Sequence, residues 1–531
     1  MVVAQEPHAT DAGVSVLKAG GNAVDAAVAV AFALAVTHPT AGNLGGGGFL
    51  LARMADGRTA FIDFRERAPE KATRDMYLDA AGKPTGDSLQ GWRASGVPGT
   101  ARGLEMAHKK LGRRGWAELV APAVGLARDG FVVSYALAES LRRAKRLAEF
   151  EESRRIFQKN GAYWEAGERF KQPELGATLE RIARDGARGF YEGPVAERFA
   201  AAMARHGGLI TAADLKDYKA IERTPLLGTY KGYQILTAPP PSSGGVGLLQ
   251  MMGVLEGLGF EKHGAGSAAA THLVAETMRR FYADRSEHLG DPDFYKVPVT
   301  GLISKSYLAR IRESIDPHRA TPSDQWKPGS PAREESAETT HFSIVDAEGN
   351  AVALTYTLNG GYGSGVTVPG LGFLLNNEMD DFSVKPGHPN LFGLVGGEAN
   401  AIAPRKTPLS SMTPTIITRG GELFMVVGAP GGSRIITGVM QVILNAADYG
   451  MNAQEAIDQP RFHHQWKPDK LYTERGFSPD TIELLRQRGH DVETNTTGVA
   501  LVEAIIVEGR GKDRWLAGGT DRRAHGKAAG Y

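Results

Sequence analysis

The hydrophobic pattern separates a helical first part of the chain from a β-rich last part. Apolar residues at helical spacing predict helices over 9–18 and 22–38, with Asn22 as the cap of the second. That second helix is almost wholly Ala and Val from Ala26 to Val36, so we expect it to be buried on nearly all sides. The pattern of residues 100–285 is mostly helical. Short alternating runs and glycine turns predict strands after residue 338.

Four consecutive glycines, Gly45 to Gly48, are better explained by close packing than by phosphate binding. A phosphate loop would continue with Lys-Ser/Thr and a helix, whereas Phe49-Leu50-Leu51 predicts a strand. Because glycine lets backbones approach closely, we expect a turn packed in the core.

A Pro-rich segment, Asp316 to Glu338, joins the two parts. It contains four prolines, many polar residues and little periodicity, which predicts a loose connector. It leads directly into Thr339, the first residue of a predicted strand.

The residues after the connector predict a β-hairpin. Two alternating runs, 339–345 and 351–358, flank a turn that contains Gly and Asn. The bulky side chains of both runs must share one face, which restricts the register. The five-residue loop pairs the last residue of the first run with the first residue of the second. The same register places Thr339 opposite Thr357, with two hydroxyls facing each other at the open end.

A threonine pair is by itself a common feature of sheets, but the position of Thr339 suggests chemistry. If the Glu338–Thr339 peptide bond were broken, Thr339 would carry a free α-amine beside its own hydroxyl. An α-amino group has a pKa near 8 and can act as a base at neutral pH. This is a known way to activate a threonine nucleophile.

Composition excludes several classes of protein. The 531 residues include 61 Lys+Arg and 60 Asp+Glu, so the basic excess typical of a nucleic-acid-binding protein is missing. The longest apolar run, Ala26 to Val36, is shorter than the roughly 20 residues of a membrane span. Cysteine is absent, which excludes disulfides, thiolate catalysis, iron–sulfur clusters and Cys-ligated zinc. The first residues lack the pattern of a secretory signal.

Several longer motifs carry a family resemblance that covers essentially the whole chain in the same order. The chain resembles the γ-glutamyltransferase (γ-glutamyltranspeptidase) family in these segments: Asp63-Phe64-Arg65-Glu66, Pro239 to Gly245, Thr339-Thr340-His341, Asn376 to Phe382, Pro408 to Met412, Pro430 to Arg434 and Arg461 to Trp466. The resemblance implies an α+β N-terminal-nucleophile hydrolase, a four-layer αββα sandwich. It also implies one precursor cut into a large subunit, 1–338, and a small subunit, 339–531, that stay associated.

The resemblance implies a role for each motif in acyl transfer. Thr339 would first attack the carbonyl of Glu338 to cut the chain. Its free α-amine would then be the general base, and its Oγ the nucleophile that takes up a γ-glutamyl group. Thr357 would hydrogen-bond the Thr339 Oγ, and the N–H groups of Gly431 and Gly432 would stabilise the oxyanion. No metal and no organic cofactor is implied.

The resemblance also implies a clamp for an amino-acid head group. Arg65 would bind the α-carboxylate with Ser410 and Ser411, and the α-ammonium would be bound by Asn359, Glu378 and Asp381. From the local sequence alone, Arg65 beside Asp63 is better explained as a surface ion pair. Arg67, on the same strand face, is a rival to Arg65 that only the motif match excludes. Likewise, Ser410-Ser411 alone would be an ordinary loop.

The implied substrates are glutathione and other γ-glutamyl compounds, with water, amino acids or peptides as acceptors. The segment Pro386 to Gly397 resembles a lid over the pocket, with Phe392 where some members carry a hydroxylated aromatic residue. We expect Phe392 to exclude water without hydrogen-bonding across the opening. The family is usually secreted, periplasmic or surface-held, so we expect a periplasmic or extracellular location.

Four other interpretations fit the sequence less well. Ser15 to Lys18 fits the S-x-x-K motif of serine acyl-enzymes, but its partner motifs are missing. His341, His463 and His464 lack the spacing of a metal site and are better explained as structural histidines. A non-catalytic amino-acid-binding protein would not need the Thr339–Thr357 pair. A glutaryl or cephalosporin-type acylase would not need the acceptors for an α-ammonium.

Overall fold

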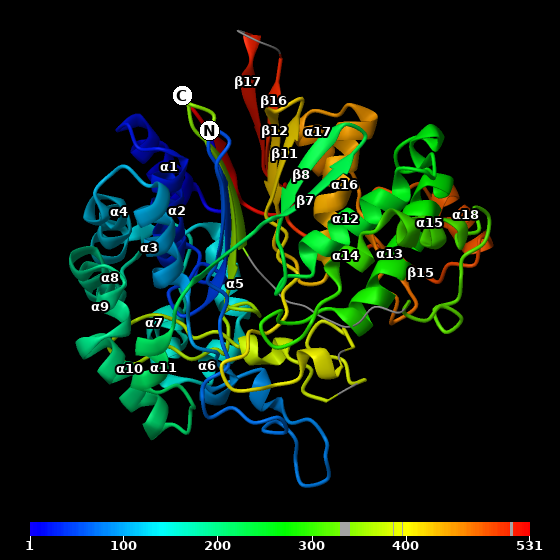
Figure 1. The fold of residues 1–531 in the computed structure, drawn as a ribbon. Helices are drawn as coiled ribbons and strands as arrows, with labels where there is room; N and C mark the ends of the chain where they lie inside the picture. Colours follow the sequence, from blue (N-terminus) through cyan, green and yellow to red (C-terminus); the bar gives the residue numbers. More distant parts are fainter. Residues whose placement is uncertain (330–339, 386, 396, 510–512) are drawn as a thin grey trace.

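The protein forms four layers, with two β-sheets stacked face to face and helices outside each (Figure 1). The computed structural model describes residues 1–329, 340–385, 387–395, 397–509 and 513–531. In order across it, the first sheet contains β18 (Lys527–Ala529), β1 (Val2–Ala4), β9 (Thr340–Val345), β10 (Ala351–Thr357), β2 (Gly47–Arg53), β3 (Thr59–Asp63) and β6 (Ile221–Arg223). The second contains β17 (Trp515–Gly519), β16 (Glu503–Glu508), β12 (Glu422–Gly428), β11 (Thr415–Arg419), β8 (Tyr233–Thr237) and β7 (Leu226–Tyr230). This confirms the predicted αββα sandwich.

The helices divide between the two outer layers. Those on the side of the first sheet are α1 (Pro7–Lys18), α2 (Ala23–Thr37), α3 (Thr100–Leu111), α4 (Trp116–Asp129), α5 (Tyr135–Arg143), α6 (Lys145–Ala148), α7 (Glu151–Gln158), α8 (Pro173–Asp185), α9 (Arg188–Tyr191), α10 (Gly193–Arg205) and α11 (Ala212–Asp217). Those on the side of the second are α12 (Gly244–Leu255), α13 (Ala268–His288), α14 (Val299–Leu302), α15 (Lys305–Glu313), α16 (Arg434–Tyr449), α17 (Ala453–Asp458) and α18 (Pro479–Gln487). Two small sheets join β4 (Phe131–Val132) to β5 (Arg169–Phe170), and β13 (Phe462–His463) to β14 (Leu471–Thr473) and β15 (Val492–Glu493).

Helix α2 confirms the first sequence prediction. Every one of its residues is buried, and Asn22 caps it by accepting the backbone N–H groups of Val24 and Asp25 at 3.0 Å. Such a cap contributes about 1 kcal/mol to the free energy of unfolding. The helix packs against the first sheet in one hydrophobic core that also contains Phe342, Ile344, Val352 and Leu354.

The β9–β10 hairpin has the predicted register. Val345 pairs with Ala351, and the described ladder runs without a shift to the pair of Thr340 and Tyr356. Phe342 and Ile344 of β9 and Val352 and Leu354 of β10 face the helices, whereas Val345, Ala351 and Ala353 face the second sheet. Glu338 and Thr339 lie outside the described residues.

The glycine run makes the predicted close backbone contacts. A Cβ on Gly46 would lie 2.0 Å from the Thr357 carbonyl oxygen, and one on Gly48 would lie 2.3 Å from that of Thr355. Glycine is therefore required where β2 lies against β10, and the phosphate interpretation has no structural support.

Two features differ from the sequence pattern. The predominantly helical stretch also contains the β7–β8 hairpin, and Val2–Ala4 forms β1 beside β9. The described part of the connector has neither helix nor strand, as expected, but it is not loose. Its backbone is held at Ser323 by Asp469 and at Gly329 by Asp284, through hydrogen bonds of 2.7 and 3.0 Å.

None of the helices in the described ranges is both long and apolar enough to cross a membrane.

Candidate active site

The candidate site lies where one end of the β9–β10 hairpin meets the end of β12. A Cβ on Gly428, the last residue of β12, would lie 2.4 Å from the His341 ring near the beginning of β9. The chain then turns through Pro430, Gly431 and Gly432 into α16. This packing places the Pro-Gly-Gly turn beside the beginning of the strand that follows Thr339.

Thr357 ends β10 and is fully buried. Its Oγ accepts the N–H of Asn359 at 2.8 Å, and its carbonyl oxygen accepts the Asn43 side chain at 2.8 Å. The hydroxyl is therefore fixed on the open end of the hairpin. Its predicted partner, Thr339, lies outside the described residues, so their hydrogen bond stays a prediction.

The Pro-Gly-Gly turn has a backbone conformation that other residues rarely adopt. Gly431 and Gly432 have φ of +140° and +60°, in the region that favours glycine. Within the described chain neither N–H donates a hydrogen bond to the protein. The turn also precedes the N-terminus of α16, which favours negative charge. Two backbone donors are thus available beside the hairpin.

Arg65 is fully buried and brings two of the predicted acceptors together. Its guanidinium pairs with Glu378 and Asp381, which lie on a short 3-10 turn (Glu378–Asp381). Its Nε and one Nη also donate to the carbonyl oxygens of Pro408 and Leu409 at 3.3 Å. The surface ion pair with Asp63 is therefore wrong, because Asp63 pairs with Arg223 at 2.6 Å. The rival Arg67 lies over the Tyr218 ring instead.

Glu66 is a buried acid at this site that the sequence interpretation gave no role. Its carboxylate lies 3.7 Å from Arg65, so three acids surround one guanidinium in the Arg65 cluster (Arg65, Glu66, Glu378 and Asp381). Burial, and then the charge of Glu378, raise the pKa of Glu66 well above its usual range. Burial also raises the pKa of Glu378 and Asp381, against the attraction of Arg65. The cluster therefore favours retention of a proton.

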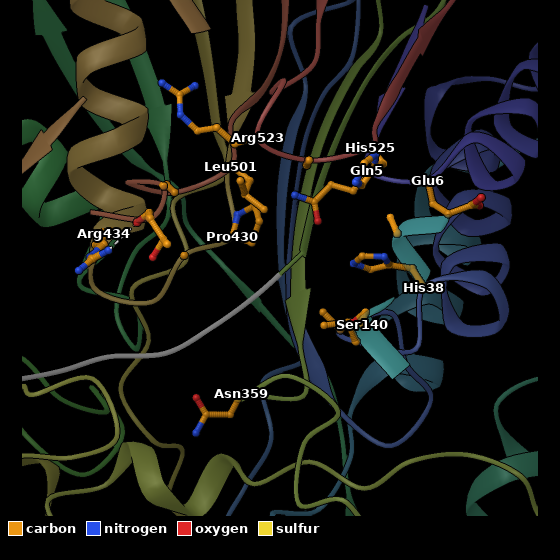
Figure 2. Close-up of a pocket in the computed structure, with 18 of the residues that line it drawn as sticks. Gln5, Glu6, His38, Ser140, Asn359, Pro430, Arg434, Leu501, Arg523 and His525 are labelled. Atoms are coloured by element: carbon orange, nitrogen blue, oxygen red, sulfur yellow. Dashed lines mark hydrogen bonds between the residues drawn. The ribbon is translucent and has the colours of Figure 1, made fainter. Parts of the chain in front are cut away.

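Asn359 connects the Arg65 cluster to a large pocket. Its Nδ2 donates to the carbonyl oxygen of Asn377, the residue before Glu378, at 2.9 Å. Its Oδ1 is buried and has no hydrogen-bond partner in the described protein. The pocket that Asn359 lines (Figure 2) has a volume of about 970 Å³. Gly431 and Phe392 also line it. Asn359 thus presents an unused acceptor to a space large enough for a ligand.

Ser410 and Ser411 lie behind the cluster, in the segment that contacts Arg65. The Ser410 Oγ accepts the Met412 N–H at 3.1 Å, and the Ser411 Oγ accepts from Arg285 of α13. Both serines are fully buried, so they do not form the ordinary loop that the local sequence favoured. Neither is among the residues that line the large pocket.

Phe392 is half-buried on the wall of the large pocket, and its role as a lid residue stays a prediction. Its carbonyl oxygen accepts from Gln465 at 3.3 Å, and its N–H donates to Asn390 at 3.0 Å. Residues 386 and 396 of the predicted lid lie outside the described part.

The three histidines lie in separate hydrogen-bond networks. Their partners are Thr355 and Ser343 for His341, Thr437 and Gln465 for His463, and Asp469 for His464. Burial lowers the pKa of His341 and His463 to about 3, so both are neutral at neutral pH. Within the described ranges, no group of three or more His, Asp or Glu side chains is placed to hold a metal ion. Ser15 of the S-x-x-K motif is exposed on α1.

Sequence reasoning missed the other wall of the large pocket. Gln5, Glu6 and His38 come from the first residues of the chain, whereas Arg434 and Tyr472 come from its last part (Figure 2 labels all but Tyr472). Only the fold brings these segments together. Arg434 ends the Pro430 to Arg434 motif but was given no role, and the other four residues belong to none of the motifs.

Comparison with known proteins agrees with this geometry. A family model described as Gamma-glutamyltranspeptidase matches residues 9–531. The glutathione hydrolase proenzyme of Escherichia coli (strain K12) is 51% identical over 527 residues, which cover 99% of this chain and 90% of that protein. A cephalosporin acylase from Bacillus halodurans has a similar structure, with a TM-score of 0.88, 28% identity and coverage of 100% of this chain and 95% of that chain.

A γ-glutamyltranspeptidase chain from Helicobacter pylori matches with a TM-score of 0.60 and 45% identity. The match covers 61% of this chain and 94% of that one. With a family model over nearly its whole length and relatives of high identity, the chain belongs to the γ-glutamyltranspeptidase family.

Proposed function

We propose that the protein is a γ-glutamyltransferase and glutathione hydrolase that first cuts itself between Glu338 and Thr339. The Thr339 α-amine takes the proton of its own Oγ, which attacks the γ-carbonyl carbon of the substrate. The amide C–N bond breaks, the leaving amine takes the proton, and a γ-glutamyl-Thr339 ester remains. Water or the amine of an amino acid or peptide then attacks the ester and releases Thr339.

The register of the β9–β10 hairpin is the observation that carries this proposal. The last described pair, Thr340 with Tyr356, supports Thr357 as the partner of the preceding threonine, Thr339. The Thr357 Oγ is buried, and the Asn359 N–H fixes it at 2.8 Å. Gly431 and Gly432 offer two N–H donors to the oxyanion, and removal of one such donor typically lowers the rate by about 10²–10³.

The charges around Arg65 support a substrate with an amino-acid head group. The Arg65 fork suits an α-carboxylate, and Ser410 and Ser411 lie in the segment beside it. Asn359 Oδ1 is a buried acceptor without a partner in the described protein, as an α-ammonium would require. For a carboxylate to bind, Arg65 would exchange one of its acidic partners for the ligand.

An acylase would share this fold but would not need acceptors for an α-ammonium in the site. The structural similarity to a cephalosporin acylase supports the shared architecture. An acyl group without an amine would leave Asn359 and the acids of the Arg65 cluster unused. The γ-glutamyl specificity therefore accounts for more of the buried polar groups.

Self-cleavage would leave a large subunit, 1–338, and a small subunit, 339–531. The relative from Escherichia coli is called a proenzyme, which supports processing. The Helicobacter pylori chain is nearly all matched by 61% of this chain, which supports a mature enzyme made of shorter chains. Family membership also supports a periplasmic or extracellular location.

The test is the pair of variants Thr339→Ala and Thr355→Ala. Thr339→Ala should remain a single chain and lose at least about 10⁴-fold in release of the amine from a γ-glutamyl anilide. Thr355→Ala removes a hydroxyl from the same hairpin, where it binds His341, and should still be cut. A cut and active Thr339→Ala enzyme would refute the proposal.

A further inference from the structure

Two buried polar side-chain atoms on the wall of the large pocket have no partner in the described protein. One is the acceptor Asn359 Oδ1, and the other is a donor, Gln5 Nε2. An unpaired buried donor or acceptor costs about 1–3 kcal/mol, so such atoms are rare unless a ligand uses them. Asn359 has a place in the proposed function, whereas Gln5 has none.

The side chain of Gln5 is held rigidly beside the nucleophile's strand. Gln5 follows β1, which pairs with β9, and only 5% of its surface is exposed. Its Oε1 accepts the Thr340 hydroxyl at 2.9 Å, and Thr340 follows Thr339 directly in the chain. The Gln5 amide therefore lies beside the residue that follows Thr339 in the chain.

Gln5 and Asn359 lie at different ends of the pocket. Figure 2 shows Asn359 in the lower half and Gln5 in the upper half. The Gln5 amide is directed into the space between them. In the proposed function the α-amino end of the γ-glutamyl group lies at Asn359. The other side of the scissile amide, which carries the leaving amine or the incoming acceptor, then extends toward Gln5.

We infer that Gln5 determines specificity for the amine partner by donating a hydrogen bond from Nε2 to its carbonyl oxygen. Amino acids and peptides carry a carboxylate or amide oxygen three bonds from the α-amine nitrogen, and simple amines do not. The donor therefore distinguishes amino-acid-like acceptors from water and alkylamines. This inference rests on the proposed function and adds a residue that contacts the acceptor.

The test compares acceptors rather than absolute rates. With a γ-glutamyl anilide as donor, transfer to glycylglycine and to n-butylamine is measured as kcat/KM for each acceptor. The ratio of the two cancels any change in the nucleophile. Gln5→Leu removes the donor, and Gln5→Glu removes the donor but retains an oxygen for Thr340. Both should lower the ratio by roughly 3- to 10-fold, the effect of one hydrogen bond.

Gln172→Leu is the matched control. Gln172 is equally buried, donates to Val36 and has an unpartnered Oε1, but it does not line the large pocket. Its variant should leave the ratio unchanged. Gln5 would only position Thr340, and the inference would be wrong, if Gln5→Leu slowed hydrolysis and transfer to both acceptors equally while Gln5→Glu kept the parent's ratio of kcat/KM values. A ratio unchanged in both Gln5 variants, whatever their rates, would also overturn the inference.

The behaviour of the parent protein distinguishes a failure of this inference from a failure of the proposed function. A parent that is neither cut nor active on the anilide would contradict the function itself. A cut and active parent with unaffected ratios in the variants would contradict only the role of Gln5.

Discussion

All three guanidinium nitrogens of Arg65 have protein partners, whereas two polar groups on the wall of the large pocket have none among the residues that the structure describes. In the Arg65 cluster a charged ligand must replace a contact that already exists. At Gln5 and Asn359 a ligand supplies a hydrogen bond that the protein lacks. The Arg65 cluster rejects ligands without the right charges, because they cannot compensate for the ion pair that they would break. Gln5 and Asn359 favour binding of any ligand with a correctly placed polar atom.

The largest expected effect on kcat is at the Pro-Gly-Gly turn, on the wall of the large pocket. A Cβ on Gly431 would lie 2.7 Å from the Ala500 backbone, and its φ of +140° disfavours other residues. Gly431→Ala should displace the donor and lower kcat by about 10²–10³-fold, as measured with a γ-glutamyl anilide. Gly438→Ala presses on the Ala500 side chain from α16 and is the control for packing alone. Equal losses of kcat in both variants would argue against an oxyanion role.

The Arg65 cluster should show its effect in substrate choice. Arg65→Lys keeps the charge between Glu378 and Asp381 but removes the planar fork. We expect kcat/KM to fall roughly 10- to 100-fold for γ-glutamyl anilide, since a hydrogen bond to a charged group contributes about 1.5–3 kcal/mol. The 4-aminobutyryl anilide, which has the amine but no α-carboxylate, should be affected much less. An equal loss on both anilides would remove Arg65 from carboxylate binding.

The smallest effect concerns the proton in the Arg65 cluster. Because burial and the charge of Glu378 raise the pKa of Glu66 in the folded state, its contribution to stability is present at low pH. It is lost as the pH rises above the ordinary value for glutamic acid. Glu66→Gln stays neutral, so its melting temperature relative to the parent should increase by a few degrees between pH 5 and pH 8.

Glu503→Gln provides the comparison for this pH effect. Burial also raises the pKa of Glu503, which lies in β16 outside the cluster. Both variants should flatten the pH dependence of unfolding, but only Glu66→Gln should change the pH dependence of KM. If Glu66→Gln lost the same stability at every pH, Glu66 would be an ionised partner of Arg65.

The sequence predicted the hairpin register and helix α2 because both depend on local patterns. Alternation and loop length specify the pairing of β9 with β10, and the Ala/Val composition specifies a buried helix. Arg65, Glu378 and Asp381 were predicted through family motifs, since no local pattern brings Arg65 to Glu378. Glu66 and Gln5 gained no role because their importance depends on burial and on unpaired atoms. These properties arise only when β1, β9 and distant loops pack together.

The measurement that tests the central claim most directly is the intact mass of the purified protein under denaturing conditions after incubation at neutral pH. Self-cleavage at Glu338–Thr339 predicts two chains of 338 and 193 residues, the smaller beginning with Thr339. A single chain of 531 residues that still releases the amine from a γ-glutamyl anilide would contradict the assignment of Thr339 as an N-terminal nucleophile.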